Sequence, residues 1–210
     1  MHQVDILGPE QTRQEFTDDR VRCFAETIIA YYERKQAEDL AASQSRIERH
    51  AGRILSAATR LFKGKKKREG EITEMQSLLA GSRDNGQLFT ARVGEKIVAT
   101  TGYRLIGSDS KTHKPVWEIV QVFVSDEHRG NKLSWTLMDA AENAIRKADP
   151  IANIVIVSDH KTVQNWAKAR QYGNITLKDH WEIEHPSETL PNQKKAEFQG
   201  KANTLLAFRK

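Results

Sequence analysis

The chain has 210 residues, of which 38% are hydrophobic, and a formal net charge of +5. This length is enough for one substantial domain, or for a domain with an appendage, and no apolar run approaches the roughly 20 residues of a membrane helix, so we expect no membrane-spanning segment. The positive charge favours anionic partners such as a phosphate-bearing cofactor, nucleic acid or an acidic protein, without choosing among them.

The N-terminal sequence and the cysteine content indicate the expected cellular location. Met1 to Gly8 lacks the basic and apolar segments of a signal peptide, so we expect a cytoplasmic protein. Cys23 is the single cysteine, which excludes an intramolecular disulfide. It falls on the apolar side of a predicted helix, where we expect a buried structural thiol.

Residues 1–84 are predicted to form a mainly helical region. Thr17, followed by two acidic residues, indicates a helix start, and apolar residues then recur at helical spacing. They form two stripes: Val21, Phe24, Ala25, Ile28, Ile29 and Tyr32, and then Ile47, Ile54, Leu55, Ala58, Leu61 and Phe62. We expect this region to pack on or cap the rest of the chain. Whether it holds one long helix or two is open, and the stripes also suit a homodimer.

Lys63 to Arg68 is the densest run of positive charge in the chain. Its simplest interpretation is a solvated loop near a helix C-terminus, where basic residues interact favourably with the helix dipole. The alternative is a contact with nucleic acid or an acidic partner. No aromatic residue interrupts the run, so bases would not stack on it.

From Gly86 onward the pattern alternates between strands and helices, which places a second region at residues 85–210. Leu88 to Val93 and Lys96 to Ile106 flank Gly94-Glu95 and predict a β-hairpin. Further strands are expected at Val116 to Val124, Ile151 to Val157, Asn174 to Ile183 and Thr204 to Phe208. Helices are expected from near Arg129 to Pro150, and from Thr162, as N-cap, to Tyr172, with Gly173 as its stop. This alternation predicts an α/β fold.

The segment from Arg129 to Ser134 joins a predicted strand to a predicted helix. The first N–H groups of a helix have no intrahelical partner and lie at the positive end of the helix dipole, so they bind phosphate groups. Arg129 and Lys132 add positive charge, and Gly130 and Ser134 keep side-chain bulk out of the approach. An ordinary strand-to-helix turn is the alternative.

These elements and this turn resemble the GNAT superfamily of acetyl-CoA-dependent N-acetyltransferases over about residues 86–208. The family motif is Gln or Arg, two variable residues, Gly, one variable residue, and Gly or Ala, after a strand that ends in a hydrophobic-aromatic-hydrophobic triplet. Val122-Phe123-Val124 supplies the triplet, Arg129 and Ser134 fit the ends of the motif, and Lys132 replaces the middle glycine. The resemblance implies a mixed, mostly antiparallel central sheet flanked by helices, enlarged here by the helical N-terminal region.

The resemblance also implies that acetyl-CoA is the cofactor. Its pyrophosphate would bind the turn, and backbone groups near Phe123 and Val124 would pair with its pantetheine arm. Lys132 would either crowd the pyrophosphate or pair with one of its oxygens, and both outcomes are open. The expected cofactor-binding residues are Phe123, Val124, Arg129, Gly130, Asn131, Lys132, Leu133 and Ser134.

Acyl transfer to an amine requires a proton acceptor and a proton for the departing thiolate. Glu118 lies where several GNAT enzymes place a catalytic carboxylate, and its apolar neighbours predict a pKa raised by desolvation. A structural or acceptor-orienting carboxylate is the alternative. Many family members carry a tyrosine as general acid where this chain has Ala169, and Tyr172 is the nearest substitute, with a packing role as the alternative. A backbone N–H near Val124 would polarise the thioester carbonyl.

No metal site is expected, because His180 and His185, five residues apart, suit ligand geometry neither on a strand nor on a helix.

From the resemblance we predict an enzyme that transfers an acetyl group from acetyl-CoA, by direct attack in a ternary complex, to the amine of a small molecule or protein. The alternative is a nucleic-acid-associated or protein-binding module that keeps the fold with weak or vestigial coenzyme A binding.

Overall fold

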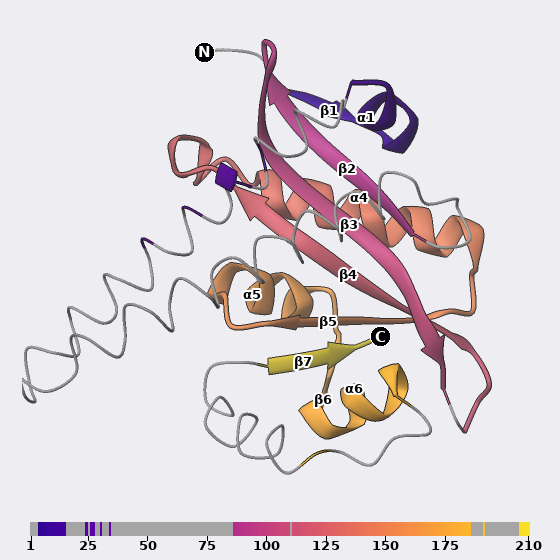
Figure 1. Cartoon of the computed structure of the whole chain (residues 1–210). Helices are drawn as coiled ribbons and strands as arrows, with labels where there is room; N and C mark the ends of the chain where they lie inside the picture. Colours follow the sequence, from indigo (N-terminus) through magenta and orange to yellow (C-terminus); the bar gives the residue numbers. More distant parts are fainter. Residues whose placement is uncertain are drawn as a thin grey trace, which may run out of the picture.

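The computed structural model describes residues 4–15, 24, 26–27, 30, 34, 86–109, 111–185, 191 and 206–210. These residues form one seven-stranded sheet with helices packed on it (Figure 1). The strands are β1 (Asp5–Leu7), β2 (Gly86–Val93), β3 (Lys96–Ser108), β4 (Pro115–Val124), β5 (Asn153–Ser158), β6 (Gly173–Ile175) and β7 (Leu206–Arg209). The helices are α1 (Pro9–Glu15), the 3-10 helix η1 (Asp126–His128), α4 (Leu133–Ala148), α5 (Lys161–Ala169) and α6 (Leu177–Glu184).

The sheet has the strand order β1-β2-β3-β4-β5-β7-β6. All neighbouring strands in it are antiparallel except β4 and β5, which are parallel. This confirms the expected α/β fold with a mixed, mostly antiparallel sheet. The predicted hairpin is also present, because Val93 pairs with Lys96, and Gly94 has the positive φ, 59°, that a tight hairpin turn requires.

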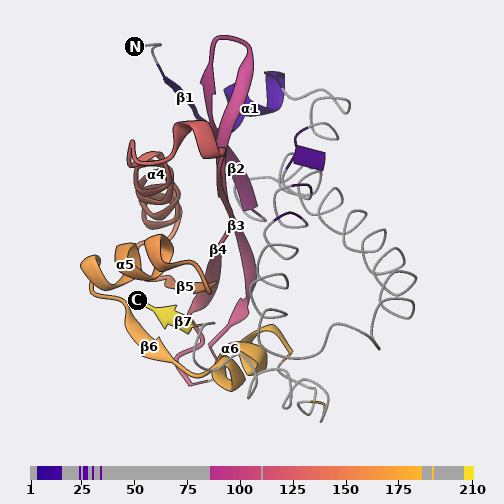
Figure 2. The same cartoon turned by 90° about the vertical axis from the view of Figure 1, so that its left-hand side faces the viewer.

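Helices lie on both faces of the sheet. Figure 2 shows α4 and α5 on one face and α6 on the other. The main hydrophobic core fills the space between the sheet and the helices α4 and α5. Its fully buried side chains include Leu137, Met138, Ile145 and Trp166 from the helices, and Tyr103, Ile119 and Ile154 from the strands. Burial of this apolar surface holds both helices against the sheet.

Strands β4 and β5 are paired over only part of their length. Their Cα partners begin at Val116 and Asn153 and end at Ile119 and Ile156, and the described part of the chain shows no pairing of the two strands beyond that rung. We call the open ends of the two strands, residues 120–124 of β4 and 157–158 of β5, the fork. Helices α4 and α5 follow its two arms along the chain.

A β-bulge at Gln121 bends the arm of the fork that β4 provides. Gln121 has a φ of 53°, and the register between β3 and β4 shifts at this point, between Thr100 and Gly102. The Thr100 hydroxyl donates a hydrogen bond to the Gln121 carbonyl at 2.9 Å, which holds the bulge. Because a bulge increases the bend and twist of its strand, it carries the end of β4 away from β5.

The expected strand from Asn174 to Ile183 is wrong over most of its length, since β6 ends at Ile175 and α6 follows. The cause is a capping box. The Thr176 N–H donates to Asp179 Oδ2 and the Asp179 N–H donates to Thr176 Oγ1, each at 3.0 Å. These bonds satisfy N–H groups that a helix start leaves unpaired, so they favour a helix directly after β6.

Two predicted helix boundaries also need correction. Helix α4 begins at Leu133, not near Arg129, because η1 and a turn come first. Helix α5 is capped by the His160 side chain, which accepts a hydrogen bond from the Thr162 N–H at 3.3 Å, so Thr162 is not the N-cap. The helix ends at Ala169, where Gln171, with a φ of 63°, supplies the left-handed residue that we expected from Gly173.

At the N-terminus, the short strand β1 was not predicted; it pairs with β2. The two apolar stripes lie almost entirely outside the described residues, as do Cys23, Lys63 to Arg68 and the boundary near residue 84. Those predictions, and the homodimer with them, stay predictions. In the described segments, no helix is both long and apolar enough to cross a membrane.

Candidate active site

The turn after β4 is exposed and leaves open space at the start of α4. Gly130 has a φ of 86°, and a Cβ placed there would meet no atom of the described residues within 4 Å. Lys132 is exposed and has φ 57° and ψ 17°, the left-handed conformation that glycine adopts most easily. Lysine at the position of the family's middle glycine therefore keeps the glycine-like backbone, and its side chain does not fill the turn.

Within the described residues, the N-terminus of α4 is left without a side-chain cap. Lys132 is its N-cap residue. The first bond back to Lys132 comes from Thr136, whose N–H donates to the Lys132 carbonyl at 3.0 Å. The amides of Leu133 and Ser134 precede that bond, and the first turn contains no acidic residue. This helix end is thus electrostatically suited to an anion.

Arg129 lies beside this helix end, held by the turn itself. Its Nη1 forms an ion pair with Asp126 Oδ1 at 3.0 Å, and its Nε donates to the Val124 carbonyl at 3.3 Å. Asp126 also pairs with Arg34. About two fifths of the Arg129 side chain is exposed (41%), so its guanidinium can reach an anion at the turn.

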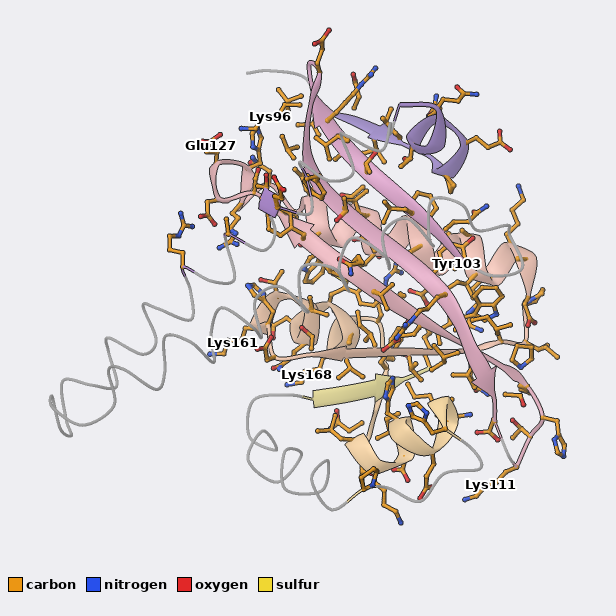
Figure 3. All side chains as sticks on the ribbon, viewed as in Figure 1. Lys96, Tyr103, Lys111, Glu127, Lys161 and Lys168 are labelled. Carbon is orange, nitrogen blue, oxygen red and sulfur yellow. The ribbon has the colours of Figure 1, made fainter. Side chains whose placement is uncertain are left out.

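Figure 3 shows where further lysines lie around the fork. Lys96 forms an ion pair with Glu127 at 3.7 Å, next to the end of β4. Lys161 is the first residue of α5, beyond the end of β5. Both arms of the fork therefore end near basic side chains.

The end of β4 is anchored by its aromatic residue. Phe123 is buried and contacts Phe24 edge to face, with ring centroids 5.5 Å apart. Val124 is half-buried, and the next residue, Ser125, donates its N–H to the Val98 carbonyl at 2.8 Å. The structure thus brings the expected cofactor-binding residues Phe123, Val124, Arg129, Gly130, Asn131, Lys132, Leu133 and Ser134 together around one strand end and one helix start.

Glu118 lies on β4, on the last but one rung before the fork, and both its carboxylate oxygens are engaged. Oε2 accepts hydrogen bonds from Nε and Nη2 of Arg104, at 3.0 and 2.7 Å. Oε1 lies 3.1 Å from Nε2 of His180, which comes from α6. Glu118 is 6% exposed and His180 is 9% exposed, so this pair is shielded from water.

The pKa of Glu118 is lowered, contrary to the expectation that desolvation would raise it. Burial acts in the expected direction and is the largest single influence. The hydrogen bond from His180 and the positive charge of Arg104 together outweigh it. Glu118 is therefore held as a carboxylate, which makes it a weak proton acceptor at neutral pH.

Tyr172 lies away from the residues around the fork. It follows the nine-residue helix α5, which begins at the fork and is about 13 Å long. Its ring packs against Trp166 with centroids 5.3 Å apart, and its buried hydroxyl has no hydrogen-bond partner among the described residues. Burial first, and then the charge of Glu142, raise the pKa of Tyr172. This environment favours the packing role over that of a general acid.

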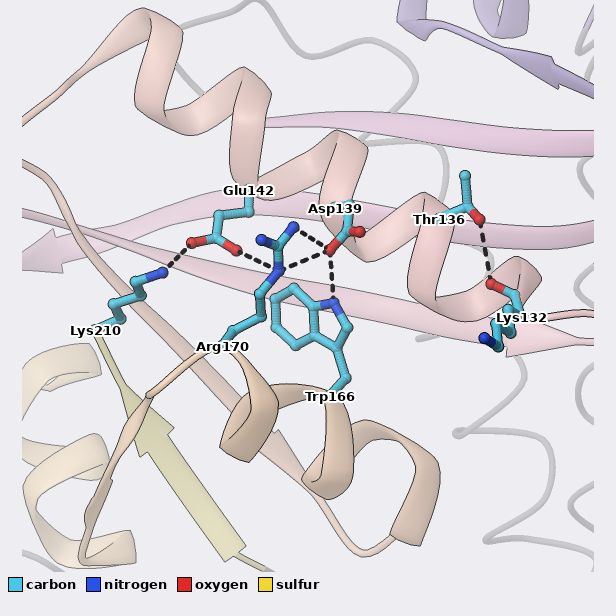
Figure 4. A network of polar contacts seen from close by, with 7 residues as sticks. All are labelled: Lys132, Thr136, Asp139, Glu142, Trp166, Arg170 and Lys210. Atoms are coloured by element: carbon cyan, nitrogen blue, oxygen red, sulfur yellow. Dashed lines mark hydrogen bonds and ion pairs between the residues drawn. The ribbon is translucent and has the colours of Figure 1, made fainter.

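A polar network holds α5 and the end of β7 against α4 (Figure 4). Asp139 of α4 accepts hydrogen bonds from Trp166 Nε1 at 2.8 Å and from Nη2 of Arg170 at 2.6 Å. Glu142, one turn further along, accepts from Lys210 Nζ at 3.0 Å. These charge-assisted bonds fix the relative position of the two helices that begin at the fork.

The acetyltransferase (GNAT) family model matches residues 51–177, which is more than half of the chain. The chain belongs to the acetyltransferase (GNAT) family. GNAT enzymes use acetyl-CoA, and the matched segment includes the fork, the turn and all of α4. The matched segment begins at residue 51, upstream of residue 86, where the resemblance described in the sequence analysis begins.

Three solved structures have a similar fold. An acetyltransferase from Streptococcus agalactiae 2603 is 15% identical, with 99% of this chain and 97% of that chain covered and a TM-score of 0.57. A GNAT-family acetyltransferase from Staphylococcus aureus Mu50 is 13% identical, with 99% and 98% covered and a TM-score of 0.52. The PaiA N-acetyltransferase from Thermoplasma acidophilum, in complex with coenzyme A, is 11% identical, with 99% and 98% covered and a TM-score of 0.52. No curated protein matches the sequence significantly.

Sequence analysis missed two residues of this site, Arg104 and His180. His180 was considered only as a metal ligand and rejected as one, and the segment around it was predicted to be a strand. The capping pair Thr176 and Asp179 was the available signal. This pair begins helix α6, which packs against β3 and brings the imidazole of His180 to Glu118.

Proposed function

We propose that this protein is an N-acetyltransferase that moves an acetyl group from acetyl-CoA to an acceptor amine by direct attack in a ternary complex. The observation that carries this proposal is the fork between β4 and β5 beside the uncapped N-terminus of α4. Strands that part in this way leave backbone N–H and C=O groups for an extended, amide-bearing ligand. Membership of the GNAT family supports acyl transfer, and the coenzyme A complex of the similar PaiA enzyme supports the choice of cofactor.

The turn residues fit the diphosphate of acetyl-CoA. The amides of Leu133 and Ser134 supply donors, and the open space at Gly130 allows a close approach to the backbone. Arg129 and the exposed ammonium of Lys132 supply positive charge, and charge-assisted bonds to phosphate are the stronger kind. Phe123 and Val124 would hold the pantetheine arm along β4.

The chemistry needs few further groups. When bound, acetyl-CoA supplies an activated thioester carbonyl. A backbone N–H near Val124 would polarise that carbonyl. A preorganised donor of this kind stabilises the developing negative charge most strongly in a site that excludes water. Glu118, two residues before the start of the fork on β4, and its partner His180 are candidate acid–base groups.

The first test is calorimetric titration of acetyl-CoA into the wild type and Arg129→Glu. We expect micromolar affinity for the wild type and at least a ten-fold loss in the variant, because the new carboxylate repels the diphosphate. Lys147→Glu is the matched control, since it makes the same charge change on an exposed residue in the last turn of α4, and its affinity should match that of the wild type.

Thiol release should then be measured over primary alkylamines, polyamines and lysine-containing peptides. A wild-type protein that shows no saturable acetyl-CoA binding at 1 mM would contradict the transferase proposal. In that case the nucleic-acid alternative is tested by duplex affinity, which should fall steeply with salt and depend on Lys65 to Arg68.

A further inference from the structure

The bulge at Gln121 sets the direction of the backbone groups in one arm of the fork, and a buried hydroxyl of the neighbouring strand holds it. We infer that Thr100 of β3 is a positioning residue for acetyl-CoA: through the bulge, its hydroxyl keeps the N–H of Val124 turned into the fork. The inference deepens the proposed function and rests on it.

Thr100 lies in the interior of the sheet, one strand away from the fork. It is 0% exposed, and it pairs with Thr90 of β2 on one side and with Phe123 of β4 on the other. Its hydroxyl donates to the Gln121 carbonyl at 2.9 Å. A buried hydroxyl without an acceptor is costly, and a valine would fill nearly the same space without that cost. The bond to β4 is thus what threonine supplies at this position and valine would not.

The register between β3 and β4 shows what the bulge inserts. The rungs on the two sides of the bulge are Gly102 with Val120 and Thr100 with Phe123. One residue of β3 therefore lies opposite two residues of β4, Gln121 and Val122, which is the pattern of a β-bulge. Without the extra residue, Val122 would take the rung opposite Thr100, and every later residue of β4 would move by one position.

This shift of one residue decides which backbone groups face the fork. In an antiparallel pair, consecutive residues point their N–H and C=O groups alternately toward the partner strand and away from it. The Ser125 N–H donates to the Val98 carbonyl of β3 at 2.8 Å, so the N–H and C=O of Val124 point away from β3. The bond from Arg129 Nε to the Val124 carbonyl, at 3.3 Å, agrees with this direction. The side away from β3 is the side of β5, so both groups of Val124 face the fork.

A β4 strand without the bulge would turn the Val124 N–H toward β3 and away from the cofactor. The bulge needs support for two reasons. Gln121 has a φ of 53°, which is unfavourable for a residue with a Cβ, and the inserted residue is left out of the regular ladder of hydrogen bonds. The Thr100 hydroxyl supplies a partner for the carbonyl of that residue. Loss of the hydroxyl therefore favours the regular register, in which Val124 no longer faces the fork.

Thr90 offers a matched control for this role. It lies directly opposite Thr100 in the pairing of β2 with β3, and it is also 0% exposed. Its hydroxyl lies 3.1 Å from the hydroxyl of Thr12 in α1. Thr12 donates its own hydrogen to the Leu7 carbonyl, so Thr90 is the donor of the pair. Thr90→Val and Thr100→Val thus each remove one buried hydroxyl donor, and only the second removes a bond to β4.

The binding test measures the dissociation constant of acetyl-CoA by calorimetry and the stability of each variant by urea unfolding. We expect Thr100→Val and Thr100→Ala to bind at least five-fold more weakly than the wild type, and Thr90→Val to stay within two-fold at a comparable loss of stability. Thr100→Ser should also stay within two-fold although it is less stable than the wild type, because it keeps the hydroxyl and loses a buried methyl group. Equal affinities of Thr100→Val and Thr90→Val would overturn the inference.

A second readout needs no cofactor. In the free wild type, NMR should show slow hydrogen exchange for the Ser125 amide, which is bonded to Val98, and fast exchange for the Val124 amide, which faces the fork. In Thr100→Val the contrast should shrink or reverse, whereas Thr90→Val should keep it. A Thr100→Val protein with the wild-type exchange pattern would overturn the inference. If acetyl-CoA fails to bind the wild type, the proposed function falls instead, and the exchange pattern still decides whether Thr100 holds the bulge.

Discussion

Lys132 shows how a single residue can depart from a family motif and keep its geometry. The family's middle glycine is suited to positive φ, and Lys132 takes this conformation with a φ of 57°. For a residue with a Cβ, the left-handed conformation costs roughly 1–2 kcal/mol. The chain accepts this cost at the point where an ammonium group lies beside the proposed diphosphate site.

Replacing Lys132 by glycine should therefore have two opposite effects. Lys132→Gly should raise the free energy of unfolding by about 0.5–1 kcal/mol, because the strain is relieved and part of the gain is offset by glycine's entropy. The same variant should bind acetyl-CoA three- to ten-fold more weakly, since it loses a charge. Lys132→Ala is the control: it should lose the same affinity without gaining stability. Urea unfolding and calorimetry measure the two effects, and a glycine variant less stable than the wild type would contradict the strain argument.

At the level of the elements, the carboxylate of Asp109 holds the loop that connects β3 and β4. Asp109 Oδ1 accepts from the N–H groups of Lys111 and Thr112, at 2.9 and 2.7 Å, and Oδ2 pairs with Arg209 of β7. The Thr112 amide first, and also Arg209, hold the pKa of Asp109 well below its ordinary value despite burial. A single side chain thus joins a loop to the strand at the far side of β5.

Asp109→Asn should destabilise the protein in a pH-dependent way. A depressed pKa in the folded state contributes stability above the ordinary pKa of about 3.9, and this contribution is lost as the pH falls. We expect the variant to be about 1–2 kcal/mol less stable at pH 7 and 5, with the difference shrinking at pH 3. Urea unfolding at the three pH values measures this, and a difference that is the same at pH 7 and pH 3 would refute the assignment.

Elements with strong local signals were predictable, and those decided by distant contacts were not. The hairpin around Gly94-Glu95 and the strand before the turn followed from alternation and turn chemistry, because both act between near neighbours. The segment that forms α6 has a strand-like composition, but its capping pair, Thr176 and Asp179, favours a helix. The ionisation of Glu118 was beyond sequence analysis, since Arg104 and His180 meet it only through folding.

For the whole molecule, ligand binding should appear as added stability. A ligand that binds only the folded state, at a concentration 100 times its dissociation constant, adds about 2.7 kcal/mol. For a chain of this size we therefore expect acetyl-CoA to raise the Tm by about 5–10 °C. Differential scanning calorimetry with Arg129→Glu as the control checks this, and the variant should shift less at the same concentration. A wild-type Tm that does not move would contradict binding to the folded chain.

Strands β4 and β5 are paired only as far as Ile119 and Ile156, so the described part of the sheet contains an open seam. A donor molecule lying in that seam would complete the layer and tie its two halves together. Chains that lack their donor would open there more often and offer a site to proteases. The lifetime of the protein in a cell would then follow the supply of the metabolite that it consumes.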